Sequence, residues 1–169
     1  MTTEIRDDQP ASLDTVFAEV KERIAVQFDQ AESLDRKAGT LLGFSSLVVT
    51  VAAGLRFAAF NESAVSTAFF VALFVLGLAF YAISVFFAFR AYAVVSYRRD
   101  PEPRPLRDLY LFEEENYTKQ RIISNVIDSF GHNAKILAEK AYAVRLASRF
   151  LFFETLVLAT ALAFERILT

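Results

Sequence analysis

The chain has 169 residues, enough for one domain, and a formal net charge of −2, which gives no reason to expect nucleic-acid binding. Hydrophobic residues make up 54% and include 18 phenylalanines, while charged residues still reach 22%, so the chain needs both an apolar environment and water. Cysteine is absent, which excludes disulfides, thiolate metal sites and cysteine nucleophiles.

The first residues are polar and acidic. They lack the basic start and apolar stretch of a cleavable signal peptide, so residues 1–11 are predicted to form a flexible acidic tail. The following residues, 12–169, are expected to form a single helical membrane domain.

Residues 12–37 have the pattern of a helix with one apolar face. Apolar side chains recur at alternating steps of four and three residues, with Gln27 in the one polar position. Ser12 suits an N-cap, and Asp14 lies in the first turn. The pattern continues into the uncharged stretch from Ala38, so one helix is predicted to run through a first membrane span at 38–60. We call this line of apolar positions along the helix a seam. Its members are Leu13, Phe17, Val20, Ile24, Ala31, Leu34, Ala38 and Leu41.

The strongest membrane signal is the run from Ser63 to Phe89, which is 27 residues without a charged side chain. A helix of that length extends about 40 Å, more than the roughly 30 Å of a bilayer's hydrocarbon core. It predicts a second span at 64–89.

Residues 90–146 are predicted to be a cytoplasmic helical hairpin with a proline-rich turn at 99–105, where three prolines in five positions argue against a helix. The helix after this turn repeats the heptad pattern and enters a third span at 147–165. Gly131, in the middle of that helix, is expected to permit close packing or a slight bend. The positions of this second seam are Ile123, Ile127, Phe130, Ala134, Leu137, Ala141, Val144, Ser148 and Leu151.

The expected fold is therefore an all-α membrane protein with three transmembrane helices, the first and third extended into a cytoplasmic helical bundle. Basic residues near the span ends, with Arg98 and Arg99 among them, place the N-terminus and residues 90–149 in the cytoplasm and the C-terminus outside. Those at the inner membrane boundary are Arg36, Lys37, Arg90, Arg145 and Arg149. These bases suit anionic headgroups, and they would equally suit an anionic ligand. The sequons at Asn61 and Asn116 are interpreted as chance matches.

Glu154 is the most unusual polar residue, because it lies about one turn inside the third span. One interpretation is a carboxylate that lines a pore or an oligomer interface. The other is a shallow residue that reaches the headgroups or pairs with Arg149, Arg90 or a hydroxyl.

Small residues line one face of the first span, which would let another helix approach closely. Two interpretations are open: packing among the three spans of one chain, or self-association between subunits. The residues of this small-residue face are Gly39, Gly43, Ser46, Thr50 and Gly54.

The sequence argues against an enzyme. His132 is the single histidine, and neither a glycine-rich phosphate loop nor a Walker-type lysine occurs. No catalytic residue, cofactor or metal site is predicted.

Two motifs resemble a known family. The stretch from Ala31 to Gly43, AESLDRKAGTLLG, is similar to the start of the first span in the Pycsar-type transmembrane effector domain. The stretch from Asn133 to Arg145, NAKILAEKAYAVR, is similar to that family's approach to its last helix. The related SLATT group shares the layout. The resemblance covers roughly residues 16–162, and it makes Asp35, Lys37, Asn133 and Lys140 structural markers of the fold.

The resemblance implies a prokaryotic anti-phage effector of the cell membrane that oligomerises on a cyclic-nucleotide signal and disturbs inner-membrane integrity. No cyclic-nucleotide-binding domain is evident in these residues, so a sensor protein or the cytoplasmic helices would receive the signal. The expected partners are the lipid bilayer and further copies of the chain. The alternatives are a non-catalytic membrane anchor or scaffold whose cytoplasmic helices dock a partner protein, and a small oligomeric channel.

Overall fold

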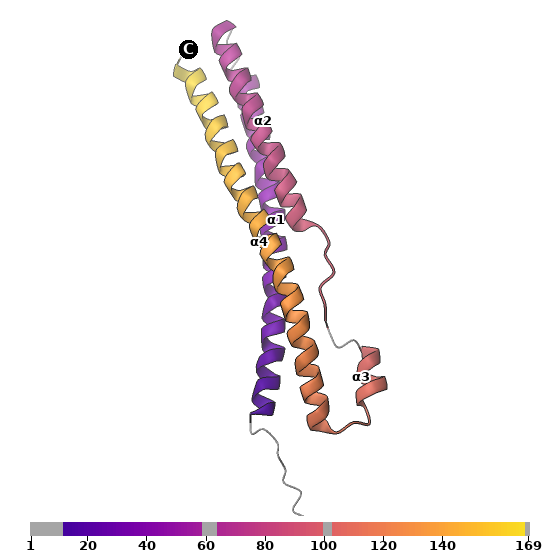
Figure 1. Ribbon diagram of the computed structural model, residues 1–169. Coiled ribbons are helices and arrows are strands. Elements are labelled where there is room, and N and C mark those ends of the chain that lie inside the picture. The colour runs from indigo at the N-terminus through magenta and orange to yellow at the C-terminus, as the bar shows by residue number, and fades with distance from the viewer. Residues whose placement is uncertain (1–11, 59–63, 100–102, 168–169) are drawn as a thin grey trace, which may run out of the picture. The chain divides into compact units, whose positions relative to one another are not determined.

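A computed structural model of the chain describes residues 12–58, 64–99 and 103–167. In these ranges the chain forms four α-helices: α1 (Leu13–Ala58), α2 (Ala64–Tyr92), α3 (Pro103–Tyr110) and α4 (Glu115–Ile167) (Figure 1). Helices α1, α2 and α4 are each long and apolar enough to cross a membrane. The predicted all-α membrane fold with three spans is confirmed. The predicted tail at 1–11 and the sequon at Asn61 lie outside the described residues.

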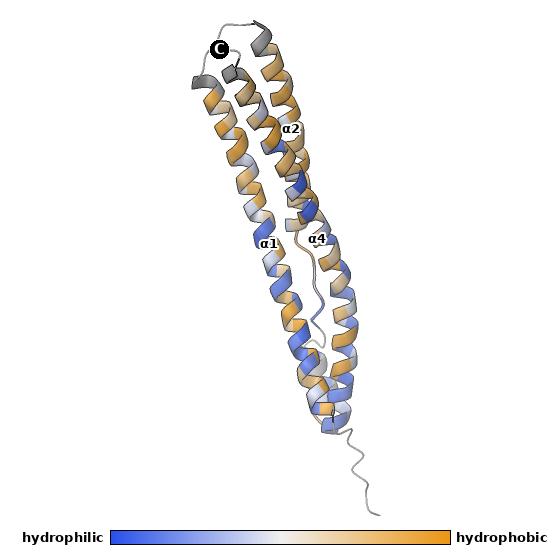
Figure 2. Ribbon diagram, turned by 90° about the vertical axis from the view of Figure 1, so that its left-hand side faces the viewer, coloured by the Kyte–Doolittle hydropathy of each residue, from blue (hydrophilic) through white to orange (hydrophobic). Residues whose placement is uncertain are grey.

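Two of the helices are much longer than a membrane requires. α1 has 46 residues and α4 has 53, so they extend about 69 Å and 80 Å against a hydrocarbon core of about 30 Å. Figure 2 shows apolar residues concentrated in α2 and in the later parts of α1 and α4, with polar residues frequent in the earlier parts. Each long helix therefore extends beyond the length of one span, and its earlier part is the more polar one.

Contacts within the chain form two compact units. Unit 1 contains residues 1–31 and 95–137, and unit 2 contains residues 32–94 and 138–169. Both α1 and α4 contribute residues to each unit.

Unit 2 is a three-helix arrangement that contains the spans. α1 and α4 run parallel, because their bonded pairs keep a nearly constant separation: 105 residues for Asp35 and Lys140, and 109 for Ser45 and Glu154. α2 runs antiparallel to α4, since Phe69 contacts Phe164 while Ser84 bonds Ala147.

Unit 1 contains the first parts of α1 and α4, which are again parallel. Asp14 pairs with Lys119 at a separation of 105 residues, and Gln27 bonds Phe130 at 103. An irregular segment at 94–99 follows α2, and α3 comes before α4.

The prediction that residues 99–105 contain no helix is wrong for residues 103–105, because α3 begins at Pro103. Pro103 and Pro105 both lie in the first turn of α3, where backbone N–H groups have no intrahelical partner. A proline there removes no hydrogen bond, and its fixed φ suits the helix.

The two predicted seams had different outcomes. Every position of the α1 seam, from Leu13 to Leu41 and including Gln27, is buried or half-buried. The α4 seam is wrong at four positions, because Ile127, Phe130, Ala134 and Ser148 are exposed, whereas its other positions are buried or half-buried. The buried face of α4 is offset by about one residue and carries polar side chains. Its buried members in unit 1 are Val126, Ser129, Asn133 and Leu137.

Candidate functional site

A buried polar network connects all three spanning helices. Ser45 of α1 donates a hydrogen bond from Oγ to Glu154 Oε2 of α4 at 2.7 Å, and its Oγ lies 3.3 Å from Ser84 Oγ of α2. Ser84 in turn donates to the carbonyl oxygen of Ala147 at 3.0 Å. Glu154 and Ser45 are fully buried, so this network belongs to the interior of unit 2.

The environment of Glu154 limits what the carboxyl group can do. Its Oε2 accepts one hydroxyl hydrogen bond, whereas Oε1 is buried and has no hydrogen-bond partner among the described residues. Charged and unsatisfied polar groups are costly at this depth in a membrane. The structure gives Glu154 one of the partners considered from the sequence, a hydroxyl group. It also encloses the carboxyl group within one chain.

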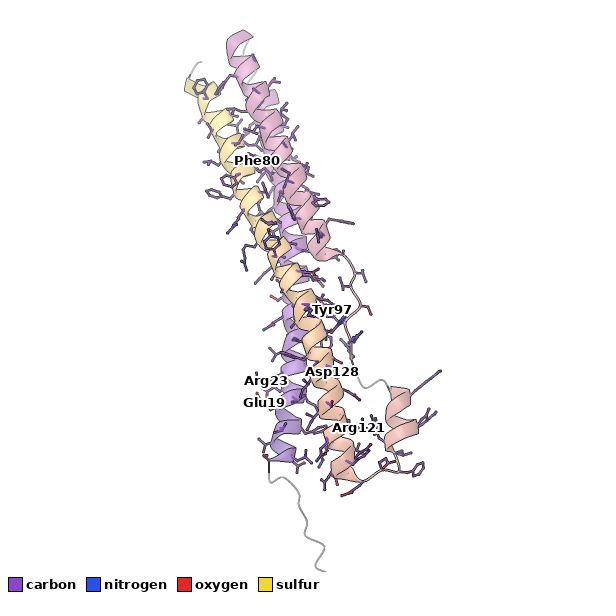
Figure 3. The ribbon with its side chains drawn as sticks, viewed as in Figure 1. Glu19, Arg23, Phe80, Tyr97, Arg121 and Asp128 are labelled. Atoms are coloured by element: carbon purple, nitrogen blue, oxygen red, sulfur yellow. The ribbon has the colours of Figure 1, made fainter. Side chains whose placement is uncertain are left out.

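Close packing of α2 on α4 surrounds this network. A Cβ atom added at Gly77 would lie 2.6 Å from Leu158 Cδ2 and 2.8 Å from Leu158 Cγ, so the Leu158 side chain would have to shift for any larger residue at position 77. Nearby, Phe80 packs against Phe150 and Phe153, with ring centroids 6.2 Å and 5.8 Å away (Figure 3). These contacts fix the height of α2 along α4.

A second polar contact lies before the network along the same helices. Lys140 Nζ lies 2.6 Å from Asp35 Oδ1, and the lysine side chain is buried. Small buried side chains pack close by, with Ala38, Ala91 and Ala143 in one cluster. Because the side chains of these alanines are small, the backbones of α1, α2 and α4 lie close together here. The long side chain of Lys140 therefore reaches Asp35 of α1 directly.

In unit 1, Asn133 holds the irregular segment that follows α2. The Arg98 backbone N–H donates to Asn133 Oδ1, and Asn133 Nδ2 donates to the Arg98 carbonyl, both at 2.9 Å. Tyr97 (labelled in Figure 3) packs edge-on against Phe28 at 6.1 Å, and the Arg99 guanidinium lies over the same ring at 4.2 Å. A polar residue of α4 and an aromatic residue of α1 thus anchor this segment.

Lys119 connects the starts of the two long helices. Its Nζ lies 2.7 Å from Asp14 and 2.6 Å from Glu115. The hydrogen bond to Asp14, followed by that to Glu115, raises the pKa of Lys119 above its ordinary value. Because the folded pKa is raised, this contribution to stability is present at neutral pH and is lost only as pH rises through the folded pKa.

The small-residue face of α1 lies on the outside of unit 2. Gly39, Gly43, Ser46, Thr50 and Gly54 are all exposed, and a Cβ added at any of the three glycines would meet nothing within 4 Å. Ser46 Oγ lies 3.4 Å from Tyr81 Oη, at the edge of this face. One of the two interpretations above was packing among the three spans of one chain. In the structure, the other spans of the same chain do not pack against these glycines.

The remaining predicted residues fall into exposed and buried groups. The bases Arg36, Lys37, Arg90, Arg145 and Arg149 are all exposed. Of the four family markers, Asp35, Asn133 and Lys140 make the contacts described above, while Lys37 is exposed. His132 is half-buried, Gly131 has open space around it, and no cluster of possible metal ligands occurs among the described residues.

Sequence reasoning missed Ser45, Ser84 and Gly77. A serine within a long apolar run, such as Ser84 between Ile83 and Val85, is a signal for a buried hydroxyl contact that could have been used. Gly77 gave no comparable signal, since its neighbours three and four residues away, Leu73, Phe74, Phe80 and Tyr81, are all large.

The fold and the network define the class: a multi-pass membrane protein with three spans joined by buried polar contacts. The model of the family described as Pycsar effector protein domain matches residues 19–165. The chain therefore belongs to the Pycsar effector family, the membrane effectors of nucleotide-signalled anti-phage defence. No curated protein and no solved structure matches the chain.

Proposed function

We propose that the protein is a non-catalytic effector of the inner membrane that self-associates through the small-residue face of α1 and thereby disturbs membrane integrity. The observation that carries the proposal is that Gly39, Gly43 and Gly54 are exposed, and a Cβ added at any of them would meet no other part of the described chain within 4 Å. In a lipid environment, apolar surface alone does not drive helix association, but small residues allow the close backbone contact that does.

The position of this face suits an oligomer in a membrane. Copies in one bilayer share an orientation, so α1 of one copy meets the parallel α1 or α4 of the next at the same height. The buried Glu154 network is then a structural support within each copy.

The test is a comparison of two variants expressed in cells that carry a membrane-potential dye. Gly43→Leu should abolish depolarisation and growth arrest, and in mild detergent it should shift the protein from oligomer to monomer. The matched control is Ala72→Leu, which adds three of the four carbons that Gly43→Leu adds, at an exposed position of α2. It should leave both properties intact.

Two results would count against the proposal. One is an unchanged potential on expression of the wild-type chain, with or without added cyclic nucleotides. The other is an equal effect of the two variants.

The orientation is proposed from the basic residues, with the N-terminus in the cytoplasm and the C-terminus outside. Because the chain has no cysteine, single-cysteine variants report sidedness without a background. An impermeant maleimide applied to intact cells should label Glu62→Cys, between the first two spans, and should not label Lys135→Cys. The opposite pattern would reverse the topology.

A second candidate function is a membrane anchor whose unit 1 docks a partner protein. A groove of about 470 Å³ between α1 and α4 favours it, because Val26 and Phe130 line that groove and are exposed in the part of the chain outside the spans. This function predicts that Gly43→Leu leaves the phenotype intact, while Val26→Lys removes it.

A further inference from the structure

A groove lies between α1 and α4 in unit 2, with a volume of about 560 Å³. Its α1 wall is a single helical face, because the lining residues recur at steps of three and four. These are Ser33, Arg36, Lys37, Thr40, Leu41 and Phe44. Val144 and Ser148 form the α4 wall.

The α1 wall changes character along its length. Residues 33–40 supply two cations and two hydroxyls, and then Leu41 and Phe44 supply apolar surface. From residue 33 to residue 44 the helix rises about 16 Å. Phe44, at the end of the wall, is 55% exposed, and Leu47, three residues further along α1, is 56% exposed. A charged region followed by an apolar region over this distance matches a phospholipid headgroup and the start of its acyl chains.

The charge of the groove is positive. Two acids lie near Arg36 and Lys37, but Asp35 already pairs with Lys140 at 2.6 Å. The other acid, Glu32, lies 3.5 Å from Arg36, with both side chains about three-quarters exposed. Such an exposed ion pair is weak and exchanges readily. Arg36 and Lys37 are therefore available to an anion in the groove.

We infer that this groove binds one anionic phospholipid, with the phosphate between Arg36 and Lys37 and the acyl chains along Leu41 and Phe44. The apolar half of the wall favours a membrane lipid over a soluble phosphate compound, because a soluble ligand would leave that half uncovered. The hydroxyls of Thr40 and Ser148 now donate to their own helix at 2.9 Å. They can turn to the phosphate when it arrives. This inference does not depend on self-association of the chain.

The test uses the full chain in mild detergent and native mass spectrometry with added phosphatidylglycerol or phosphatidylcholine. The wild-type protein should retain phosphatidylglycerol in preference. Arg36→Gln with Lys37→Gln should weaken that preference about 25-fold, since each base near an anionic lipid contributes about fivefold. Helix content by circular dichroism should stay unchanged, because both side chains are exposed.

The matched control is Arg90→Gln with Arg145→Gln, which removes the same charge from bases that do not line the groove. It should keep most of the preference. An equal loss in both double variants would overturn the inference, since it would indicate a general surface charge. Inorganic phosphate that displaces the lipid at millimolar concentration would overturn it too, because the groove would then serve a soluble anion.

Discussion

At the scale of single residues, three buried polar side chains bond a partner on another segment. Glu154 bonds Ser45, Lys140 bonds Asp35, and Asn133 bonds the backbone of Arg98. Apolar contacts between two helices persist when one helix slides slightly along the other. Each of these polar pairs, in contrast, forms at only one position of the two segments along their common axis. The polar residues therefore define the register between segments.

The Asp35–Lys140 pair should show this in a double-mutant cycle. Lys140→Met should destabilise the fold by about 1–3 kcal/mol, because Asp35 is left half-buried without its partner. Asp35→Asn should cost less, and the two changes together should cost less than their sum by about 1 kcal/mol. Unfolding in mixed detergent micelles measures all three. Additive losses would show that the 2.6 Å contact contributes nothing.

Glu154 allows a sharper substitution. Glu154→Gln retains the shape and an acceptor for Ser45, so stability should change by less than about 1 kcal/mol. Glu154→Ala leaves a cavity and removes the acceptor, so it should cost about 2–4 kcal/mol in the same assay. If Glu154→Gln costs as much as Glu154→Ala, the carboxyl group has a role beyond its bond to Ser45.

At the scale of helices, Gly77 determines how closely α2 approaches α4. A methyl group at this position would overlap Leu158, with Cδ2 at 2.6 Å and Cγ at 2.8 Å. Gly77→Ala should therefore destabilise the protein by about 1–3 kcal/mol in micelle unfolding. Adding Leu158→Ala should restore part of the loss by making room for the methyl group.

Gly131 is the matched control, because it lies within α4 with open space around it. Gly131→Ala should stabilise the protein by about 0.5–1 kcal/mol through better helix propensity. A loss of stability at Gly131 comparable to that at Gly77 would show that contact with Leu158 is not the cause.

Whether the sequence could predict the buried face of a helix depended on whether the residues of that face are apolar or polar. The buried face of α1 is mostly apolar, so hydrophobic periodicity identified it from Leu13 to Leu41. The buried face of α4 carries Ser129, Asn133, Lys140 and Glu154, which periodicity counts as exposed. Periodicity therefore selected the neighbouring face with Ile127 and Phe130.

The same limit applies to the site. The family motifs singled out Asp35, Asn133 and Lys140, but sequence alone gave them no partners. Ser45 and Glu154 are 109 residues apart, and only the parallel packing of α1 and α4 brings them together. Single residues could be found from the sequence, whereas their pairing required the register between helices.

At the scale of the whole molecule, two units hold separate sets of contacts although α1 and α4 pass through both. The bonds of Asn133 to Arg98 belong to unit 1, and the bonds of Ser45, Ser84 and Glu154 belong to unit 2. Because no bond of either set depends on a residue of the other unit, each unit should be able to loosen while the other remains folded.

Hydrogen exchange of the full chain in nanodiscs tests this independence. Asn133→Leu removes both bonds to Arg98, each contributing about 1 kcal/mol, so the Arg98 amide should exchange about 30-fold faster. Amides at 40–55 and 145–160 should keep their wild-type rates. Ala134→Leu, at the exposed neighbouring position, is the control and should leave Arg98 unchanged. Faster exchange throughout unit 2 in Asn133→Leu would instead mean that the chain opens as one cooperative body, so that a signal received in unit 1 would reach the spans as unfolding.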